Sequence, residues 1–387
     1  MSKRKVCVVV TARPSYSRVR SAMYAMQQHA DLELQVVVGS SAMLRRYGNT
    51  IQYIEGDGFK VNARIYNIIE GENLTTMAKS AGVAIVEIST VFDNLKPDCV
   101  ISIADRYETL STSTAAAYMN IPLVHLQGGE VTGSIDEKVR HANTKLADVH
   151  LVSTKLAAER VYKMGEDRDR IYVTGCPSID IARTVQEANA DHRDIYQHYA
   201  NHGVGADISV DGDYLIVMQH PVTTEYNLAK EHVQETLHAI HEMGVPTIWF
   251  WPNVDAGSDG TSKGIRQFRE LVQPTNIRFL KNMLPEHFLT LLLNSRAIIG
   301  NSSTAIREAS FLGVPAVNIG IRQRGRERGD NVVDTSYVRS AITQAIFQQI
   351  EHGPYSSQHL YGDGNAGEKI ANILASHEFS IEKQLNY

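Results

Sequence analysis

The stretch from Arg296 to Pro315 reads RAIIGNSSTAIREASFLGVP, an apolar strand followed by hydroxyl residues and then by a helical pattern. The apolar residues of one helical face are Ala305, Ile306, Ala309 and Leu312, and Gly313 before Val-Pro is expected to end the helix. The start of such a helix offers free backbone N–H groups and a positive dipole end, both of which suit a phosphate. Glu308, about one turn inside, can accept hydrogen bonds from ribose hydroxyls. The alternative is an ordinary capped helix with a solvated glutamate.

Short apolar strands alternate with amphipathic helical patterns along nearly the whole chain, which is typical of parallel sheets covered by helices on both faces. The expected strands are 5–11, 32–39, 98–104, 121–127, 149–153, 171–175, 214–219, 246–251, 277–281, 296–300 and 315–319. A chain of 387 residues exceeds the usual size of one hydrophobic core. We therefore predict an α/β fold with two doubly wound domains, 1–180 and 181–365, joined near Ser178 to Arg183 just before the polar segment 187–213.

The composition excludes several classes of protein. The net charge of −5 has no concentrated basic face, so we expect no nucleic-acid partner. Cys7, Cys99 and Cys176 are odd in number and show no metal-ligand spacing, and the first two lie in apolar strand-like runs, which suits a reducing cytoplasm. The apolar run after the basic N-terminus is too short for a signal peptide, and no stretch is long enough to span a bilayer.

One glycine motif is misleading. Gly362 to Gly367, read as GDGNAG, spells the dinucleotide fingerprint, but it follows Tyr361 rather than an apolar strand. It opens the last helix with no βαβ unit after it. We therefore expect no nicotinamide site there and no cofactor or metal in this protein.

Carboxylates follow two strands of the first half. Asp105 comes directly after strand 98–104, and Glu130 and Asp136 follow strand 121–127. Parallel strands present their carboxyl ends at one edge, so we expect these groups in one cleft, lying between the two halves. Crowded carboxylates perturb each other's protonation and can divide acid and base roles. The alternative is that Asp105 and Asp136 only cap helices. Arg13, after the first strand, is expected to point into the same cleft and suits a diphosphate, or else pairs with a carboxylate.

The second half has polar groups at its own strand ends. His220 follows strand 214–219 and is a candidate general acid or phosphate donor, although a single histidine is often structural. Arg322 and Arg326 follow the strand after the Ser-Ser helix. They either bind a phosphate or lie in a solvated loop.

These segments together identify a family. DRYE, GGEVTGSIDEKVRHANTKLA, GCPSID, QHPVTT, WPNVDAGS, GNSSTAIRE, GIRQRGRE and YGDGNA occur in this order. With them the chain resembles, over essentially its whole length, the hydrolysing UDP-N-acetylglucosamine 2-epimerases of sialic-acid and related nonulosonate biosynthesis.

The resemblance implies a GT-B fold, two Rossmann-like domains with the nucleotide held mainly by the second, and a last segment, 366–387, that packs back on the first. It implies a cytoplasmic enzyme that is a homodimer or homotetramer and acts on a UDP-sugar. UDP is eliminated with loss of the C2 proton, and the resulting glycal is hydrated with inverted configuration at C2. The products are UDP and a free 2-acetamido sugar of manno configuration.

By position, the resemblance assigns the diphosphate to Ser302 and Ser303, the ribose to Glu308, and further phosphate charge to Arg13 and Arg322. His220 would assist the leaving group, while Asp105 and Asp136, with Glu130 as a further catalytic candidate, handle protons at the sugar. The other expected substrate contacts are Arg106, Gln127, Asn253 and Asp255. The chemistry requires a neutralised diphosphate, because the C2 proton is barely acidic until positive character develops at C1.

Gln127 departs from the family pattern, in which many members have an active-site glutamate at this position. An amide cannot act as a base, so either a neighbouring carboxylate does that work alone or Gln127 contacts a different sugar substituent. The opening TARPSYS also differs from the common Arg-Ala-(Asp/Glu)-Tyr pattern.

Three other functions compete with hydrolysis. A non-hydrolysing 2-epimerase would leave the sugar on UDP, and a GT-B glycosyltransferase should lack the carboxylate cluster of the first half. A non-catalytic nucleotide-sugar sensor would not turn over its ligand. The sequence leaves open whether the sugar is N-acetylglucosamine or a 2,4-diacetamido-2,4,6-trideoxyglucose, and whether the base is uracil or guanine.

Overall fold

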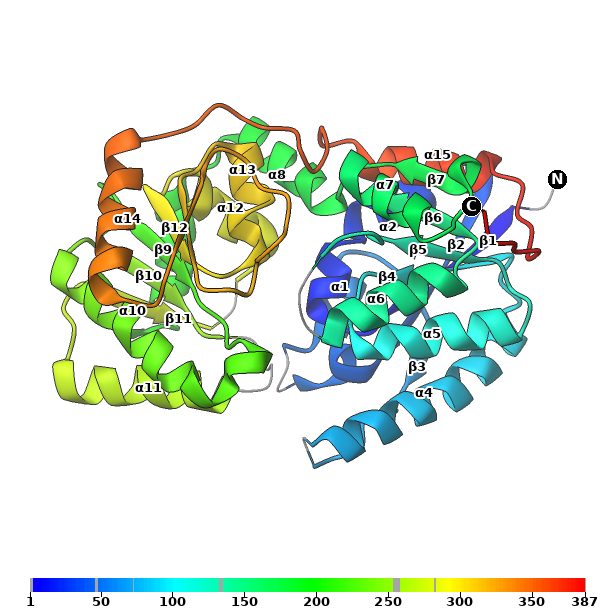
Figure 1. The fold of residues 1–387 in the computed structure, drawn as a ribbon, viewed down its shortest axis with the longest axis horizontal. Coiled ribbons are helices and arrows are strands. Elements are labelled where there is room, and N and C mark those ends of the chain that lie inside the picture. Colours follow the sequence, from blue (N-terminus) through cyan, green and yellow to red (C-terminus); the bar gives the residue numbers. More distant parts are fainter. Residues whose placement is uncertain are drawn as a thin grey trace. The chain divides into compact units, whose positions relative to one another are not determined.

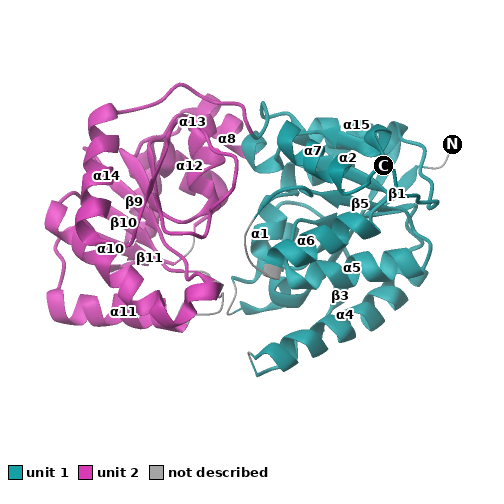
Figure 2. Cartoon of the chain, in the orientation of Figure 1, with its two compact units in different colours: residues 1–131, 135–180, 361–387 teal, residues 132–134, 181–360 magenta. Residues whose placement is uncertain are grey.

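The structure is a computed structural model that describes residues 3–45, 48–71, 73–131, 135–252, 258–281 and 283–386, without the side chains of residues 135, 223 and 258. The chain forms two compact units (Figures 1 and 2). Unit 1 contains residues 1–131, 135–180 and 361–387, and unit 2 contains residues 181–360. Each unit is built around its own sheet, so each is described by itself.

Unit 1 contains a parallel sheet in the order β3-β2-β1-β4-β5-β6-β7. Its strands are β1 (Arg4–Val10), β2 (Leu32–Gly39), β3 (Val61–Ile65), β4 (Cys99–Ile103), β5 (Leu123–Leu126), β6 (Val149–Val152) and β7 (Ile171–Val173). Its helices are α1 (Arg13–Ser17), α2 (Arg20–Gln28), α3 (Thr50–Gly56), α4 (Leu74–Leu95), α5 (Tyr107–Tyr118), α6 (Ile135–Leu146), α7 (Lys155–Lys163) and α15 (Ala366–Ser376), with α8 (Pro177–Ala188) at the junction of the units.

The central strands of the unit 1 sheet are buried on both faces, because most of their residues are apolar. Along β1, Val6, Val8 and Val10 pack with α2, α3 and α15. The alternate residues, Cys7 and Val9, pack on the other side with α4 and α5. Alternate side chains of one apolar strand thus pack on opposite faces, as expected for a sheet that is covered by helices on both sides.

Unit 2 repeats the arrangement with the order β14-β13-β12-β9-β10-β11-β8, in which only β8 is antiparallel to its neighbour. Its strands are β8 (Val204–Gly205), β9 (Leu215–Met218), β10 (Thr247–Phe250), β11 (Ile277–Leu280), β12 (Ala297–Gly300), β13 (Ala316–Ile319) and β14 (Val332–Thr335). Its helices are α9 (His192–Ala200), α10 (Ala229–Met243), α11 (Ser258–Val272), α12 (Pro285–Leu293), α13 (Glu308–Leu312) and α14 (Arg339–His352).

Both units therefore have the Rossmann strand order, and the chain is an α/β protein of GT-B type, which confirms the predicted fold class. The order reverses between β1 and β4 in unit 1, and between β9 and β12 in unit 2. Ligands of such sheets bind at the carboxyl ends of the strands beside this switch point. Residues that follow these four strands are thus the first candidates for chemistry.

Three strands were missing from the sequence prediction, namely β3, β8 and β14. All three are edge strands, with at least one side open to solvent and few fully buried positions. They lack the continuous apolar run that reveals a central strand. Their absence from the prediction did not affect the strand order around either switch point.

The GCPSID and YGDGNA segments, 186 residues apart at their first positions, meet within unit 1. Gly175 and Gly362 both have positive φ, +86° and +120°. Their backbones approach so closely that a Cβ on Gly175 would lie 3.0 Å from the Cα of Gly362. The N–H of Cys176 donates to the carbonyl of Tyr361 at 2.7 Å. The glycines of the fingerprint-like segment therefore permit contact between two backbones.

Asp180, the last residue of GCPSID, caps α15. Its carboxylate accepts from the backbone N–H groups of Ala366 and Gly367 at 2.9 and 2.7 Å, and from the Ser21 hydroxyl of α2 at 2.7 Å. A carboxylate at a helix N-terminus is favoured by the orphan N–H groups and the helix dipole. This contact links the start of α15 to α2 and to the first turn of α8.

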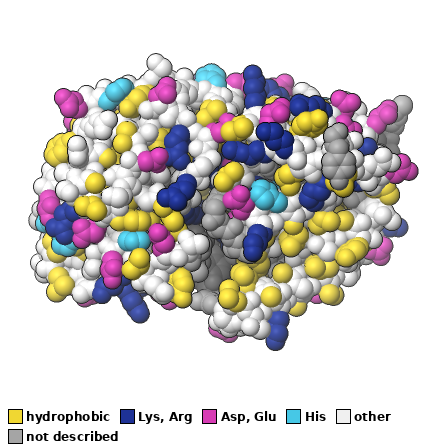
Figure 3. All heavy atoms as spheres, in the orientation of Figure 1, with side chains coloured by type: hydrophobic (Ala, Val, Ile, Leu, Met, Phe, Trp, Pro, Cys, Tyr) yellow, Lys and Arg dark blue, Asp and Glu magenta, His cyan; other side chains and the backbone are white. Residues whose placement is uncertain are grey.

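The surface is of mixed polarity. On the face in Figure 3, charges of both signs are interspersed, while apolar side chains gather over α4 and α5. Leu74, Val86 and Tyr118 are among the large exposed apolar residues of these two helices. No helix in the described part of the chain is long and apolar enough to cross a membrane. Cys7 and Cys99 are buried thiols in the sheet, as the sequence indicated.

Candidate active site

Asp105 lies at the switch point of unit 1, two residues after β4, and its carboxylate is buried. It accepts a hydrogen bond from the guanidinium of Arg140, a fully buried residue of α6. The Arg18 guanidinium lies 3.7 Å from the other carboxylate oxygen of Asp105. A buried guanidinium stabilises the ionised form of its carboxylate partner. The pair therefore favours a carboxylate that can accept a proton.

The turn that carries Asp105 is held by buried side chains. Ala104 has a φ of +59°, which is strained for a residue with a side chain. Its carbonyl accepts from His125 Nε2 at 2.9 Å and from the Asn143 amide at 3.4 Å. His125 Nδ1 lies 3.0 Å from the Thr144 hydroxyl.

His125 is a neutral imidazole in this arrangement. Burial lowers the pKa of His125 to about 3. Its single N–H must be on Nε2, because the carbonyl of Ala104 can only accept. The Thr144 hydroxyl then donates to Nδ1. A fixed tautomer thus connects α6 to the turn before Asp105.

The other predicted residues of unit 1 have defined places. Glu130 is buried in the segment after β5, and Asp136 is the second residue of α6. Neither Asp105 nor Asp136 occupies an N-cap position, because Arg106 caps α5 and α6 begins at Ile135. The capping alternative is therefore wrong for Asp105, while Asp136 lies in the first turn of α6.

Arg106 and Arg13 are only partly buried. Arg106 Nε lies 3.3 Å from the buried carboxylate of Glu108. Arg13 is the first residue of α1, after β1, and its guanidinium lies 5.5 Å from the ring centre of Tyr53. Both follow strands at the switch point. Their assignment to the substrate stays a prediction.

Gln127 is buried directly after β5 with a φ of +66°. Its amide donates to the Cys176 sulfur at 3.0 Å, and the same sulfur lies 3.0 Å from the Ser178 hydroxyl. The amide nitrogen is thus engaged with the protein. A contact between Gln127 and substrate stays a prediction.

In unit 2, His220 follows β9 and Ser302 follows β12, so the two lie beside the second switch point. Asn301 connects them. Its side-chain oxygen accepts from the His220 N–H at 2.7 Å, and its amide donates to the His220 carbonyl at 2.8 Å. The Asn301 carbonyl in turn accepts from Arg322 Nη1 at 3.1 Å and from the Gln323 amide at 2.8 Å. Three predicted residues are therefore organised around one buried asparagine.

Gly300 makes this junction possible. It has a φ of +128°, and a Cβ there would lie 2.1 Å from the carbonyl oxygen of Met218 at the end of β9. Only glycine permits that approach. The hydroxyl segment consequently leaves the sheet directly beside His220.

The hydroxyl segment differs in detail from the prediction. A single helix was expected, but a 3-10 turn over Ser303–Ala305 comes first and the α-helix begins only at Glu308. Ser302 caps the turn by accepting from the Thr304 N–H at 3.3 Å. Gly313 ends α13 in the left-handed conformation, as predicted. The short turn is explained by local Ser and Thr bonds that compete with helical ones.

Glu308 is buried, and its Oε2 atom has no hydrogen-bond partner among the described residues. An unsatisfied buried carboxylate oxygen is costly and points to a donor supplied from outside. The two hydroxyls of a ribose are donors of the required kind.

Asn253 and Asp255 lie outside the described residues, so their predicted substrate contacts stay predictions. The described residues contain no group of three His, Cys, Asp or Glu side chains placed to hold a metal ion.

Sequence reasoning missed Arg140, Arg18, His125 and Asn301. Arg140 was detectable, because it lies four residues after Asp136 on one face of a helix. His125 had the appearance of an ordinary strand residue.

Comparison with known proteins decides the family. The family described as UDP-N-acetylglucosamine 2-epimerase matches residues 24–375. The chain belongs to this family. Members of this epimerase family are enzymes that act on nucleotide sugars.

The chain is similar to several epimerases over nearly its full length. It is 31% identical over 371 residues to the UDP-N,N'-diacetylbacillosamine 2-epimerase (hydrolyzing) of Legionella pneumophila, covering 96% of this chain and 95% of that one. It is 29% identical over 383 residues to the UDP-N-acetylglucosamine 2-epimerase of Neisseria meningitidis, covering 97% and 96%. A crystal structure of the 2-epimerase from Neisseria meningitidis bound to UDP-GlcNAc matches with a TM-score of 0.81 at 19% identity, covering 96% and 100%.

Proposed function

We propose that this epimerase hydrolyses a UDP-linked 2-acetamido sugar to UDP and the free sugar with inverted C2 configuration. The observation that carries the chemistry is the buried Asp105 at the unit 1 switch point, held by Arg140. The 31% identity to a relative named as hydrolysing supports release of the sugar. The solved relative bound to UDP-GlcNAc supports a UDP-sugar as the ligand.

In the first step, the Asp105 carboxylate takes the C2 proton while the bond between C1 and the diphosphate oxygen breaks. The electron pair of the C–H bond forms the C1–C2 double bond, and the electron pair of the C–O bond leaves with UDP. His220 gives a proton to the departing diphosphate, and Ser302, Ser303 and Arg322 neutralise its charge. Glu308 accepts from the ribose hydroxyls.

In the second step, water adds to C1 of the glycal and loses a proton to solvent, while Asp136 delivers a proton to C2 on the face opposite to the one that lost it. Two separate groups are required because the two protons pass on opposite faces of the ring. Gln127 cannot serve as a base, because it is an amide. Glu130, which lies close to it in the sequence, is therefore a further candidate for proton transfer at the sugar.

Isotope labelling tests the proposal. In deuterated water, the wild-type protein should convert UDP-GlcNAc, or its 2,4-diacetamido-2,4,6-trideoxy analogue, to UDP and a free sugar with deuterium at C2. The same sugar linked to GDP shows whether the enzyme requires uracil or accepts guanine as the nucleobase. Asp105→Asn and Asp136→Asn should bind UDP normally and form no labelled sugar. Asp98→Asn, at the amino end of β4, is the matched control and should keep full activity.

Each contrary result has a definite meaning. A free sugar without C2 deuterium would exclude elimination and hydration. Full activity in both active-site variants would refute the carboxylate assignments.

A second candidate is the non-hydrolysing reaction, favoured by the similar identity to the relative named simply UDP-N-acetylglucosamine 2-epimerase. That enzyme would give C2 deuterium in a sugar still attached to UDP. NMR of the same reaction therefore separates the two.

A further inference from the structure

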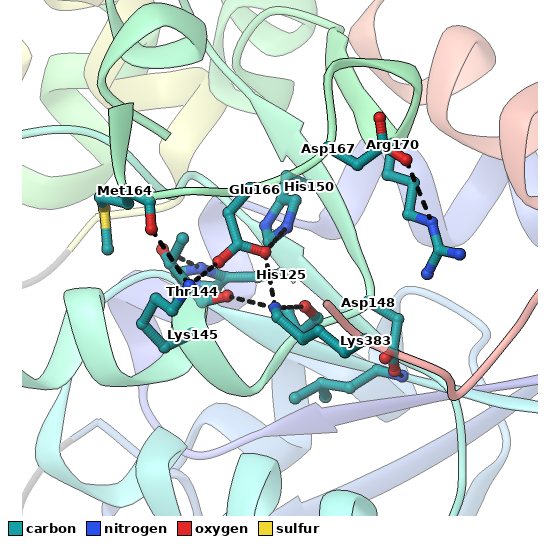
Figure 4. Close-up of polar contacts among 12 residues, drawn as sticks. His125, Thr144, Lys145, Asp148, His150, Met164, Glu166, Asp167, Arg170 and Lys383 are labelled. Carbon is teal, nitrogen blue, oxygen red and sulfur yellow. Dashed lines mark hydrogen bonds and ion pairs between the residues drawn. The ribbon is translucent and has the colours of Figure 1, made fainter. Parts of the chain in front are cut away.

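A cluster of charged side chains lies in unit 1 and is not used in the proposed chemistry. Its centre is Glu166, whose carboxylate is only 3% exposed. Figure 4 shows Lys145, Lys383 and His150 converging on this carboxylate. Lys145 Nζ lies 2.5 Å from one oxygen, and Lys383 Nζ and His150 Nε2 lie 2.6 and 3.0 Å from the other.

The charges of this cluster are mutually dependent. Burial opposes ionisation of Glu166, but hydrogen bonds from His150, Lys145 and Lys383 outweigh it and lower the pKa of Glu166 to about 2. Burial lowers the pKa of His150, which as a neutral ring donates from Nε2. One carboxylate thus bonds two ammonium groups, while Asp148 attracts Lys383 from farther away, so the Lys383 ammonium still needs a further hydrogen-bond acceptor.

The end of α6 is that acceptor. Lys383 Nζ donates to the Ala147 carbonyl and, at 3.4 Å, to the Thr144 carbonyl. The last carbonyls of a helix have no partner within the helix and carry its negative dipole end. Lys383 therefore ties the last turn of α6 to Glu166. Lys145 lies in the last turn of α6 itself and makes a second tie, from its Nζ to Glu166 and to the Met164 carbonyl.

Lys383 is itself held in place by backbone contacts of residues 377–386, the segment after α15. The carbonyl of its neighbour Glu382 accepts from Arg170 at 3.3 Å. The N–H of Asn386 donates to the Gly165 carbonyl at 3.1 Å, next to Glu166. These contacts fix the backbone on both sides of Lys383 and so hold its ammonium group beside Glu166.

The same helix also holds the turn that carries Asp105. Arg140 bonds the Asp105 carboxylate, and the Thr144 hydroxyl bonds the His125 ring that fixes the carbonyl of Ala104. Helix α6 is thus a rigid link between Lys383 and the turn that carries Asp105. A small shift of α6 would move Arg140 and Thr144 together.

We infer that Lys383 is a positioning residue, which seats α6 so that Arg140 and the His125 chain hold Asp105 for proton transfer. This inference rests on the proposed role of Asp105 at the sugar. Lys383 is distinct from the proposed catalytic residues, because its ammonium contacts Glu166 and the carbonyls at the end of α6.

The test compares Lys383→Met, Lys383→Arg and Lys145→Met by steady-state UDP release, UDP calorimetry and thermal unfolding. Lys383→Met should lower kcat roughly 10- to 100-fold, because displacements of about 1 Å have effects of this size. Its KM and its Kd for UDP should stay within about twofold of wild type. Lys383→Arg should recover most of the kcat. Lys145→Met removes the tie that the helix itself makes to the same carboxylate, and should lower kcat in the same direction.

Two results would overturn the inference: an unchanged kcat in Lys383→Met, or a loss of kcat that only follows the unfolded fraction. A wild-type protein that releases no UDP contradicts the proposed function instead. Amide hydrogen exchange then still tests the positioning, since faster exchange in α6 and at residues 104–106 is expected for Lys383→Met and unchanged exchange refutes it.

Discussion

The side chain of Asn301 and the backbone of His220 exchange two hydrogen bonds, of 2.7 and 2.8 Å, across the switch point of the second sheet. Both residues are buried. An asparagine amide that both accepts from and donates to one residue copies the pairing between neighbouring strands. These two bonds continue the pairing of β9 and β12 beyond the ends of the two strands. His220 therefore starts its loop from a fixed backbone position.

Asn301→Ala removes both bonds and should lower kcat. We expect a loss of roughly 10-fold, because two net hydrogen bonds contribute about 1–3 kcal/mol. His220→Ala, which removes the proposed acid itself, should lose on the order of 100-fold or more. The double variant should be little worse than His220→Ala alone, since both changes act on the same group. Steady-state UDP release from the substrate of the wild type measures all three.

Asn276→Ala is the matched control for this prediction. The Asn276 amide also donates to two backbone carbonyls, those of Ile240 and Val245, at 3.1 and 3.2 Å, but at the amino end of β11. It should lose stability with normal turnover. Equal kcat losses in Asn276→Ala and Asn301→Ala would mean that Asn301 acts on folding alone.

Glu308→Gln should show opposite effects on stability and on binding. The Oε2 atom is buried without a partner in the described part of the protein, so the ionised group destabilises the unliganded state. The amide should raise the unfolding temperature of the free protein. It should also weaken UDP binding roughly 10-fold, because a bond from a ribose hydroxyl to a carboxylate contributes about 1.5–3 kcal/mol. Calorimetry with UDP and thermal unfolding without it give the two values.

Ser303→Ala is the companion variant, and it should weaken UDP binding without stabilising the free protein. Ser303 is only partly buried in the 3-10 turn, so its hydroxyl loses no buried bond. Wild-type UDP affinity in both variants would remove the proposed nucleotide site from this segment.

The strand ends could be predicted from the sequence, but the contacts between them could not. An apolar run reveals where a buried strand stops, and this placed Asp105 and His220 at sheet edges. Their partners are set by the packing of distant segments: Arg140 is 35 residues from Asp105, and Asn301 is 81 residues from His220. The 3-10 turn before Glu308 was missed because Ser and Thr bonds change the start of a helix without changing its apolar spacing.

The Glu166 cluster makes a prediction about acid stability. The folded pKa of Glu166 is about 2, below its ordinary value of 4.5. The unfolded state therefore binds the proton first, so the stabilisation from this group is complete above about pH 4.5 and is lost as the pH falls toward 2. The difference in urea midpoint between wild type and Glu166→Gln should be constant above about pH 5.5 and shrink below pH 4.5. Converted to a free energy of unfolding, this difference cannot change by more than the contribution of one proton, about 1.4 kcal/mol per pH unit. Glu159→Gln is the control, because its carboxylate pairs with Arg168 at 3.1 Å on the exposed surface and such pairs contribute little. A pH-independent difference for Glu166→Gln would show that the carboxylate is not ionised against Lys145 and Lys383.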